Sequence, residues 1–350
     1  MAQIGAGSVI GALSYVAVGR EITYGTYATC TAALNVLSSS MKLVKDSKIL
    51  EEIQASRTNS NSISLSRTLE GDLEFYFSPV SNACNYILHN AFGGGGVTTA
   101  TATGETAGGL AFTHTVDVNN FLTTYSSLSI NTRKGDATNG KIFEYTGLRV
   151  NELTLTAEID EPLVCSVSLI GKDATITTND VSSGMSGQLT QTPLSFVNGR
   201  LSIESSSASL TSSVFWNIQS VEFTMSNNLD AESGRRIGSD TVDVLPAGLA
   251  QFELKCSVRF DTTTAFSHMV AHDKLYGELE FQGDTLGTSI IRQGIKLNFN
   301  NLRIKDAGDP EIGGPNEVLT SEVTFLVLRD PTASGYAVRA KVTNAVSTYA

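Results

Sequence analysis

The feature that most constrains the fold is a strict alternation of apolar and polar residues, which is clearest in QFELKCSVRF, residues 251–260. The apolar side chains of this stretch fall on one face of an extended chain, and the polar ones fall on the other. Successive side chains in a β-strand point to opposite sides, so a period of two indicates a half-buried strand. The same period recurs in DLEFYF, ELTLTAEI, SVEFTM and SEVTFLV. The sequence therefore predicts a mainly β protein.

Two stretches have helical periodicity, and each directly follows an alternating strand. SPVSNACNYILHNAF predicts a helix over about 79–92, with Ser78 as the N-cap and Pro79 at the first helical position. DTTTAFSHMVAHDKLYG predicts a second helix over about 262–274, with Asp261 as the N-cap. These two helices are the only ones that the pattern predicts with a clear apolar stripe.

The stretch HNAFGGGG, residues 89–96, resembles a phosphate-binding loop because of its four glycines. Phosphate groups bind at the start of a helix, however, and these glycines follow the end of one. Gly94, and Gly277 in the corresponding place after the second helix, can take the left-handed conformation that closes a helix. We therefore predict a helix stop that leads into a loop.

A series of elements occurs twice along the chain. Leu73, Phe77 and His89 correspond to Cys256, Phe260 and His272 at one constant separation. Farther on, LRVNELTL (148–155) matches LNFNNLRI (297–304), with Asn151 on Asn300, and both strands break their alternation at the same place. A shared break predicts a shared β-bulge. We infer two tandem β-sandwich or barrel domains, each with one flanking helix.

The predicted boundaries follow changes in composition along the chain. They give an N-terminal arm over 1–20, a first domain over 21–176 with a Gly/Thr-rich insertion at about 93–125, a linker over 177–192, and a second domain over 193–350. The linker is polar, rich in Gly and Ser, and without period. The arm is apolar but reaches Arg20 too early for a membrane span, so we expect it to pack on a neighbour.

Charge and cysteine content exclude several classes of protein. The net charge is -11, the isoelectric point is about 4.9, and only 17% of residues are charged. Affinity for DNA phosphates comes mostly from Lys and Arg, so the balance argues against a DNA-binding protein. The four cysteines are far apart, with no C-x-x-C pair, which predicts buried, reduced thiols in a protein made in a cytosol.

Candidate chemistry is weak everywhere in the sequence. His268 and His272 have the helical spacing of a metal pair, but HMVAH lacks the H-E-x-x-H pattern, and a polar helix face is favoured. The nucleophile and nucleotide motifs are absent. Acidic pairs such as Glu51 with Glu52 and Glu278 with Glu280 leave a β-sandwich glycosidase open, although solvated strand faces are favoured. We predict no catalytic, cofactor or metal residue.

The chain resembles the major tail tube proteins of long, non-contractile phage tails, in the version with two tube domains in one chain. The resemblance covers nearly the whole chain and rests on EITYGTYAT, LEFYF with its helix, YTGLRVNELTLT, SVSLIG, LSFVNGRLSI, VEFTMSNN, FELKCSVRF and VTFLVLRD. It implies tube-type β domains that join edge to edge into rings around a channel. Stacked rings would form a tube through which the genome passes.

The resemblance also implies partners and a location. Three duplicated chains would form a trimeric ring with pseudo-six-fold symmetry, and hexameric rings are the alternative. Tape-measure and tail-terminator proteins are the expected partners, with non-specific passage of DNA, no sequence-specific nucleic acid binding and no membrane. The expected location is the tail of the virion after synthesis in the host cytoplasm.

An acidic lumen would repel DNA and let it slide, and the net charge has the required sign. We predict that Glu152, Glu158, Asp160 and Glu161 supply part of that lining. The glycine-rich insertion is expected to make a ring-to-ring or outer-surface contact. The alternative to a structural tail protein is a carbohydrate-binding β-sandwich module or a glycosidase.

Overall fold

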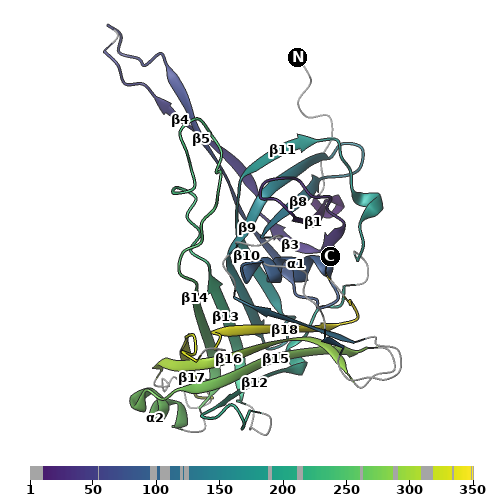
Figure 1. The fold of residues 1–350 in the computed structure, drawn as a ribbon, viewed down its shortest axis with the longest axis vertical. Coiled ribbons are helices and arrows are strands. Elements are labelled where there is room, and N and C mark those ends of the chain that lie inside the picture. The colour runs from purple at the N-terminus through teal and green to yellow at the C-terminus, as the bar shows by residue number, and fades with distance from the viewer. Residues whose placement is uncertain are drawn as a thin grey trace.

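A computed structural model describes residues 11–53, 55–94, 101–102, 111–118, 121, 126–187, 191–210, 216–260, 263–286, 291–308, 318–332, 335–347 and 349. Within them the protein is mainly β, with two short α-helices, and the strand pairing is antiparallel throughout. The predicted fold class is confirmed. Figure 1 shows the strands gathered around the helix α1, and a long hairpin that extends beyond the rest of the molecule.

One antiparallel sheet, here called the front sheet, runs without interruption through both halves of the chain. Its strands in spatial order are β4 (Lys42–Ile49) with β3 (Val36–Ser39), β5 (Ser62–Tyr76), β10 (Val164–Gly171), β9 (Lys141–Glu158), β13 (Ile218–Ser226), β14 (Gln251–Arg259), β17 (Thr320–Val327) and β16 (Arg292–Ala307). The pairing of β9 with β13 joins the first half of the chain to the second. We call this pairing the seam.

Each half also has a back sheet, and the long strands β9 and β16 belong to both layers. The first back sheet contains β2 (Ala32–Leu34), β1 (Tyr15–Glu21), β8 (Ser127–Lys134), the start of β9, and β11 (Asp173–Thr177). The second contains β12 (Gly199–Glu204), β15 (Leu275–Thr285), the start of β16, β18 (Val338–Asn344), β7 (Phe112–Asp117) and β6 (Thr101–Ala102). Short 3-10 turns occur at Gly11–Leu13, Ser182–Gly184 and Phe196–Asn198.

Strand pairing confirms the internal repeat at its beginning. The backbone N–H of Phe77 donates to the carbonyl of Leu163 at 2.9 Å, and that of Phe260 donates to the carbonyl of Leu319 at 3.0 Å. The two residues therefore occupy the same place at the ends of β5 and β14.

The predicted register of the later strands is wrong. Asn151 is the extra residue of β9 against β10, and Lys305 is the extra residue of β16 against β17. Val150 pairs with Leu169, and Ile304 pairs with Phe325, so LRVN corresponds to LRIK and Asn151 does not correspond to Asn300. A second irregularity occurs in β9 opposite β8 and in β16 opposite β15. Sequence matching aligned the bulge of β9 opposite β10 with the irregularity of β16 opposite β15, which are different positions in the repeat.

The helices are shorter than predicted. The first, α1, is Asn82–Ala91, and its N-cap is Ser81, whose hydroxyl accepts from the Cys84 N–H, so Ser78 and Pro79 precede the helix. The second, α2, is Thr264–Ala271 with Thr263 at the N-cap. Because serine and threonine can cap at any of several neighbouring positions, the packing of the first turn decides which one does.

Left-handed residues close both helices, but not as predicted in the second. Gly93 and Gly94 have positive φ angles of 93° and 65°, and the Gly94 N–H donates to the His89 carbonyl, which confirms the helix stop. In α2 the left-handed residue is His272, with φ 53°, whereas Gly277 lies inside β15. A Cβ at Gly277 would lie 2.6 Å from the Leu302 side chain, so a larger residue there would have to displace Leu302.

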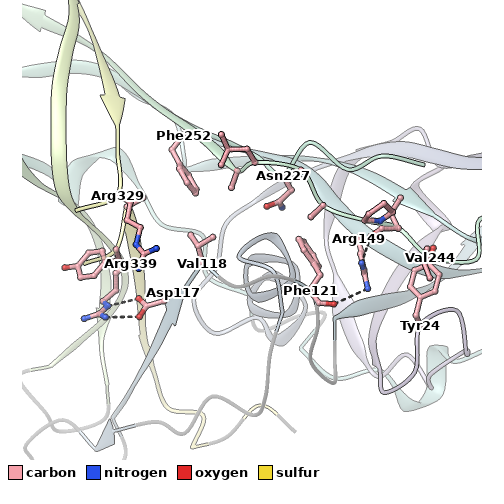
Figure 2. Close-up of a pocket in the computed structure, with 18 of the residues that line it drawn as sticks. Tyr24, Asp117, Val118, Phe121, Arg149, Asn227, Val244, Phe252, Arg329 and Arg339 are labelled. Carbon is pink, nitrogen blue, oxygen red and sulfur yellow. Dashed lines mark hydrogen bonds and ion pairs between the residues drawn. The ribbon is translucent and has the colours of Figure 1, made fainter. Parts of the chain in front are cut away.

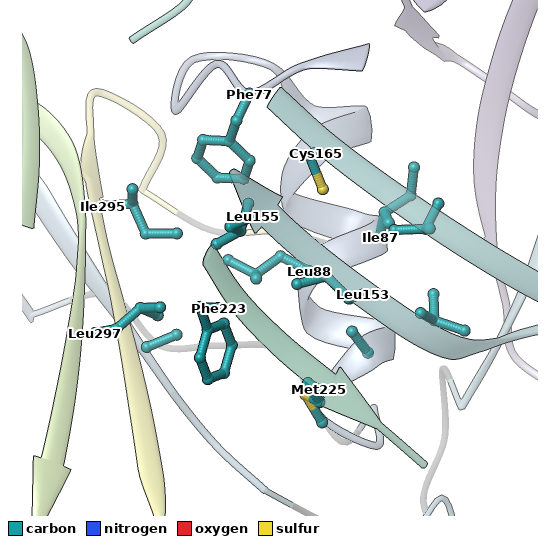
Figure 3. Packing of buried hydrophobic residues seen from close by; sticks show 14 of the residues in the cluster. Phe77, Ile87, Leu88, Leu153, Leu155, Cys165, Phe223, Met225, Ile295 and Leu297 are labelled. Atoms are coloured by element: carbon teal, nitrogen blue, oxygen red, sulfur yellow. The ribbon is translucent and has the colours of Figure 1, made fainter. Parts of the chain in front are cut away.

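The hydrophobic core is continuous across the seam. A row of directly paired, buried residues crosses the front sheet, consisting of Phe75, Cys165, Leu155, Phe223, Leu254 and Phe325. Figure 3 shows Ile87 and Leu88 of α1 beside this row, with Ile295 and Leu297 of β16 facing it from the second half. The two halves therefore share one core.

The expected N-terminal arm and insertion both contain strands of the observed sheets. Residues 15–20 of the expected arm lie in β1, whose residues are all buried, while residues 1–10 lie outside the described residues. The expected insertion lies between α1 and β8, and its strand β7 pairs with β18 at the other end of the chain. The remaining part of the insertion lies largely outside the described residues.

The shared core predicts that the two halves unfold together. Phe223 is fully buried, pairs with Leu155 across the seam, and has its ring 5.8 Å from that of Phe299. We expect Phe223→Ala to lower the free energy of unfolding by about 3–5 kcal/mol, because the large cavity cannot collapse. Denaturant titration should show one transition at a lower midpoint. Thr224→Ala, the adjacent residue on the other face, is the control, and two separate transitions in the unsubstituted chain would contradict the idea.

Candidate functional site

The side of the front sheet that faces away from the core is a polar surface built by strand alternation. One row of paired residues on it consists of Asp72, Ser168, Glu152, Ser226 and Gln251, and the next consists of Glu74, Ser166, Thr154, Thr224 and Glu253. Residues that pair directly share a face, so these rows lie side by side across the seam. We call this surface the polar face. It carries mostly Ser, Thr and acidic side chains.

The structure places the four predicted lining residues in two positions. Glu152 and Glu158 lie exposed in β9 and point to the polar face. Asp160 and Glu161 are also exposed, but they lie in the turn between β9 and β10, where Asp160 has a left-handed φ of 67°. The first two therefore belong to the polar face, and the other two belong to its rim.

Further acidic residues share the polar face and were not singled out from the sequence. They are Glu70, Asp72, Glu74, Glu222, Glu253 and Glu322. The signal that finds them is the phase of alternation, because each is separated by two or four residues from another residue of the same face. Sequence reasoning used this phase in residues 251–260 as well, but it named lining residues only in β9 and the turn after it.

Basic residues on the polar face are mostly engaged by these acids. The Lys255 ammonium lies 2.9 Å from Glu253 and 3.8 Å from Glu222, and Lys305 lies 3.5 Å from Glu253. The hydrogen bond from Lys255 lowers the pKa of Glu253, and the same bond raises the pKa of Lys255. In the first half of the sheet, Lys42 lies 3.6 Å from Glu70, whereas Asp72, Glu74, Glu152 and Glu158 are paired directly with serines.

The front sheet ends at two edges, one in each half of the chain. Among the described residues β4 pairs only with β5, and residues 303–307 of β16 pair only with β17. An unpaired strand edge presents backbone N–H and C=O groups that can pair with another chain. Both edges are therefore sites at which a second molecule can extend the sheet.

A groove of about 1300 Å³ lies between the two halves, on the other side of the seam (Figure 2). Arg149 fills one end, where its guanidinium is stacked 5.1 Å from the ring of Tyr24 and 5.0 Å from that of Phe121. It donates to the carbonyls of Leu245 and Phe121 and to the Ser126 hydroxyl. Burial lowers the pKa of Arg149 and raises that of Tyr24 to about 12.

The two carboxylates that line the groove are paired with arginines, whereas Arg149 and Arg329 donate to backbone carbonyls. At the far end Arg339 contacts both oxygens of Asp117, at 2.7 and 2.8 Å, and Asp243 is paired with Arg236. Asp117 and Asp243 are the carboxylates among the described lining residues, and each is engaged by an arginine, whereas glycoside hydrolysis requires two carboxyl groups available to the sugar. The side chains that line the groove therefore contact both halves, and we interpret the groove as a joint between them.

The other candidates from the sequence do not form a site. Glu278 and Glu280 both contact Lys296, at 2.8 and 3.5 Å, and so serve an ion-pair network of the second back sheet. His268 is hydrogen-bonded to Asp273 at 2.8 Å, and His272 closes α2. In the described part of the chain, groups of three or more potential metal ligands are not found.

The four cysteine thiols are not placed for chemistry. All four cysteines are buried, as predicted, and none of them is paired in a disulfide. Burial raises the pKa of the Cys84 thiol to about 11 and that of Cys256 to about 12, so neither is an activated nucleophile. Within the described residues no helix is long and apolar enough to span a membrane.

A sheet with one buried face, one polar face and two unpaired edges defines a structural protein suited to assembly. Comparison with protein families agrees: the model described as "Phage tail tube protein" matches residues 11–327, and the chain belongs to this family. Its members are structural components of the phage virion tail. No curated protein sequence matches the chain.

The role of Arg149 as a joint can be tested by its removal. We expect Arg149→Met to keep the apolar stem but lose the contacts to both carbonyls and the hydroxyl, lowering the free energy of unfolding by about 1–3 kcal/mol. Chemical denaturation measures the loss. Arg259→Met, at an exposed position of β14, is the matched control. Equal stability of the two variants would show that the groove is not a joint.

Proposed function

We propose that this tail tube protein assembles into rings, that the rings stack into a tube, and that the polar face of the front sheet lines a channel through which the genome passes. The observation that carries the proposal is the front sheet itself. It already joins two equivalent halves by strand pairing, and each of its ends has an unpaired edge. Repetition of the same pairing between chains would close the sheet into a barrel and remove both edges.

The seam supplies the template for the contact between chains. Thr154 pairs with Thr224 across it, and their hydroxyl oxygens are 3.4 Å apart. By the register of the repeat, Gly308 is the counterpart of Thr154, and Lys42 is the counterpart of Thr224. Gly308 of one chain would then pair with Lys42 of the next.

The proposed number of chains in a ring rests on the repeat and on the resemblance to tail tube proteins with two tube domains. Each chain contributes two copies of the repeat, so three chains would give a trimer with pseudo-six-fold symmetry. Leu43 supports an edge contact, because its counterpart Met225 is fully buried at the seam whereas Leu43 is only half-buried in the single chain. Hexameric rings of this chain are the alternative.

The proposed lining consists of neutral hydroxyls and carboxylates, with Glu152 and Glu158 in β9 and with Asp160 and Glu161 at the rim. DNA carries about one negative charge per 1.7 Å of its axis, so such a wall repels the phosphates and makes no lasting contact. Passage would be independent of base sequence. Tape-measure and tail-terminator proteins are the partners expected inside and at the end of such a tube.

The long hairpin formed by β4 and β5 is proposed to reach the next ring. If the front sheet closes edge to edge, its strands run along the channel, and a hairpin that continues two of them projects beyond the ring (Figure 1). Val44, Ile49, Ile63 and Leu65 of this hairpin are exposed apolar side chains. Their burial against a second copy would stabilise the stack.

Ring closure predicts a specific cross-link between chains. We expect Gly308→Cys and Lys42→Cys, combined in one chain, to give disulfide-linked trimers under mild oxidation, because paired residues place their Cβ atoms about 4.5–5.5 Å apart. Non-reducing electrophoresis measures the product. Gly308→Cys with Lys48→Cys is the out-of-register control. Monomers alone, from chains that microscopy shows in rings, would contradict the register, and ladders ending at six chains would favour the hexamer.

The lining predicts a specific effect of charge. Glu152→Lys with Glu158→Lys should make assembled tubes retain short double-stranded DNA roughly ten-fold more than unsubstituted tubes at low salt, with the difference lost at high salt. Co-sedimentation of labelled DNA measures retention. Glu204→Lys with Asp284→Lys, on the second back sheet, changes the net charge equally. Equal retention by both variants would place Glu152 and Glu158 outside the channel.

A further inference from the structure

The hairpin of β4 and β5 is supported only at its base. From here on we call this hairpin the arm, and it is distinct from the expected N-terminal arm over residues 1–20. The pairing of β5 with β10 ends at Leu69 opposite Gly171. Beyond that point β4 and β5 pair only with each other within the described residues. An isolated two-stranded ribbon is marginally stable and free to pivot. The direction of the arm therefore depends on what holds its base.

Ion pairs and hydrogen bonds hold the arm where it leaves the front sheet. The Nη2 of Arg67 donates to Oδ1 of Asp240 at 3.0 Å, and its Nε lies 3.0 Å from Oδ2. The remaining nitrogen, Nη1, donates to Asp173 of β11, also at 3.0 Å. Lys45, on the opposite strand of the arm, lies 3.8 Å from Asp240. We call Arg67, Asp173, Asp240 and Lys45 the clamp.

Backbone contacts reinforce the clamp. The Arg67 N–H donates to the Asp240 carbonyl at 2.7 Å. In the other direction Arg235 donates to the Arg67 carbonyl at 3.1 Å and to the Thr68 hydroxyl at 2.8 Å. Side chains and backbone of both partners thus take part, so the contact fixes an orientation as well as a distance.

The segment that supplies Asp240 to the clamp is firmly packed. Asp240 and Arg235 belong to the connection between β13 and β14, residues 227–250, which comes from the second half of the chain. Val242 and Leu245 of this connection are buried against Phe121 and Leu229. At Gly234 the chain passes so close to the Val244 carbonyl that no Cβ would fit. The connection can therefore transmit the position of the second half to the arm.

The repeat shows how this arrangement arises. Val44 pairs with Thr68 as Ser226 pairs with Gln251, so the connection occupies in the second half the place that the arm occupies in the first. In the first half the two strands continue outward, and in the second the chain folds back onto Arg67. Each chain thus carries one arm and one clamp.

We propose that the clamp is a positioning device that points the arm toward a second copy of this chain in the adjacent ring; this inference rests on the stacked-ring function proposed above. An arm held in its docking direction loses little conformational freedom when it binds, so docking is stronger than for a pivoting arm. Each ion pair is partly exposed, with Asp240 44% and Arg67 27% accessible, and acts mainly through geometry.

The first test measures the arm in the unassembled chain. Ile53→Cys on the arm and Ile176→Cys on β11 place spin labels at two exposed sites, while the native cysteines are buried. We expect Asp240→Asn to broaden the distribution of distances between the labels about two-fold. Asp243→Asn, in the same connection but paired with Arg236, is the matched control and should leave it unchanged. An unchanged distribution in Asp240→Asn would overturn the inference.

The second test measures assembly by electron microscopy at equal protein concentration. We expect Asp240→Asn to form rings as readily as the unsubstituted chain, but to form tubes only at a roughly ten-fold higher concentration, which corresponds to about 1.4 kcal/mol. Asp243→Asn should assemble normally. Tubes of equal length at all concentrations would overturn the inference. Failure of the unsubstituted chain to form rings would instead overturn the proposed function, while the spin-label result would still decide whether the clamp holds the arm.

Discussion

Backbone hydrogen bonding at the edges of the front sheet governs the rest of the structure. A strand edge leaves N–H and C=O groups without partners, and pairing them is the strongest reason for a β protein to assemble. In this chain one such edge is already satisfied internally, because β9 pairs with β13 from Glu152 to Glu158. That pairing aligns the buried rows of both halves into one core and places both polar surfaces on the same side. The outer edges of β4 and β16 also have unpaired backbone groups, and no strand of the described chain pairs with them.

Corresponding elements of the two halves lie in different surroundings. In the first half, α1 lies near the middle of the molecule, and Asn227 and Asn344 from the second half donate to the carbonyls of Ala91 and Pro79 at its two ends (Figure 1). In the second half, α2 lies at the end of the molecule, and Val270, the counterpart of the buried Ile87, is 70% exposed. The connections differ as well, because one extends as the hairpin and the other folds back and supplies Asp240 to the clamp.

The low charge content of the chain is reflected in the composition of the polar face. The polar face carries mostly hydroxyls with acids spaced between them, and where bases occur, as at Lys255, carboxylates engage them. A surface of this kind is well hydrated but offers a polyanion few places to bind. The groove behind the seam shows the opposite design, with Arg149 buried among carbonyls and aromatic rings that fix one half against the other.

The main strands, their polar and apolar faces and the two helices could be predicted from the sequence, because the period of two and the helical stripe are local properties of the chain. The alternation placed Glu152 and Glu158 on the exposed face of β9 for that reason, and their position in a channel stays a prediction. The register of the repeat could not be predicted, and sequence matching aligned the wrong bulges, since strands of equal period look alike until their partners are known. The tertiary structure supplies those partners. It alone also showed the seam, the unpaired edges and the clamp between Arg67 and Asp240. These depend on contacts between residues far apart in the chain, and no local pattern records which distant strand or carboxylate will lie opposite.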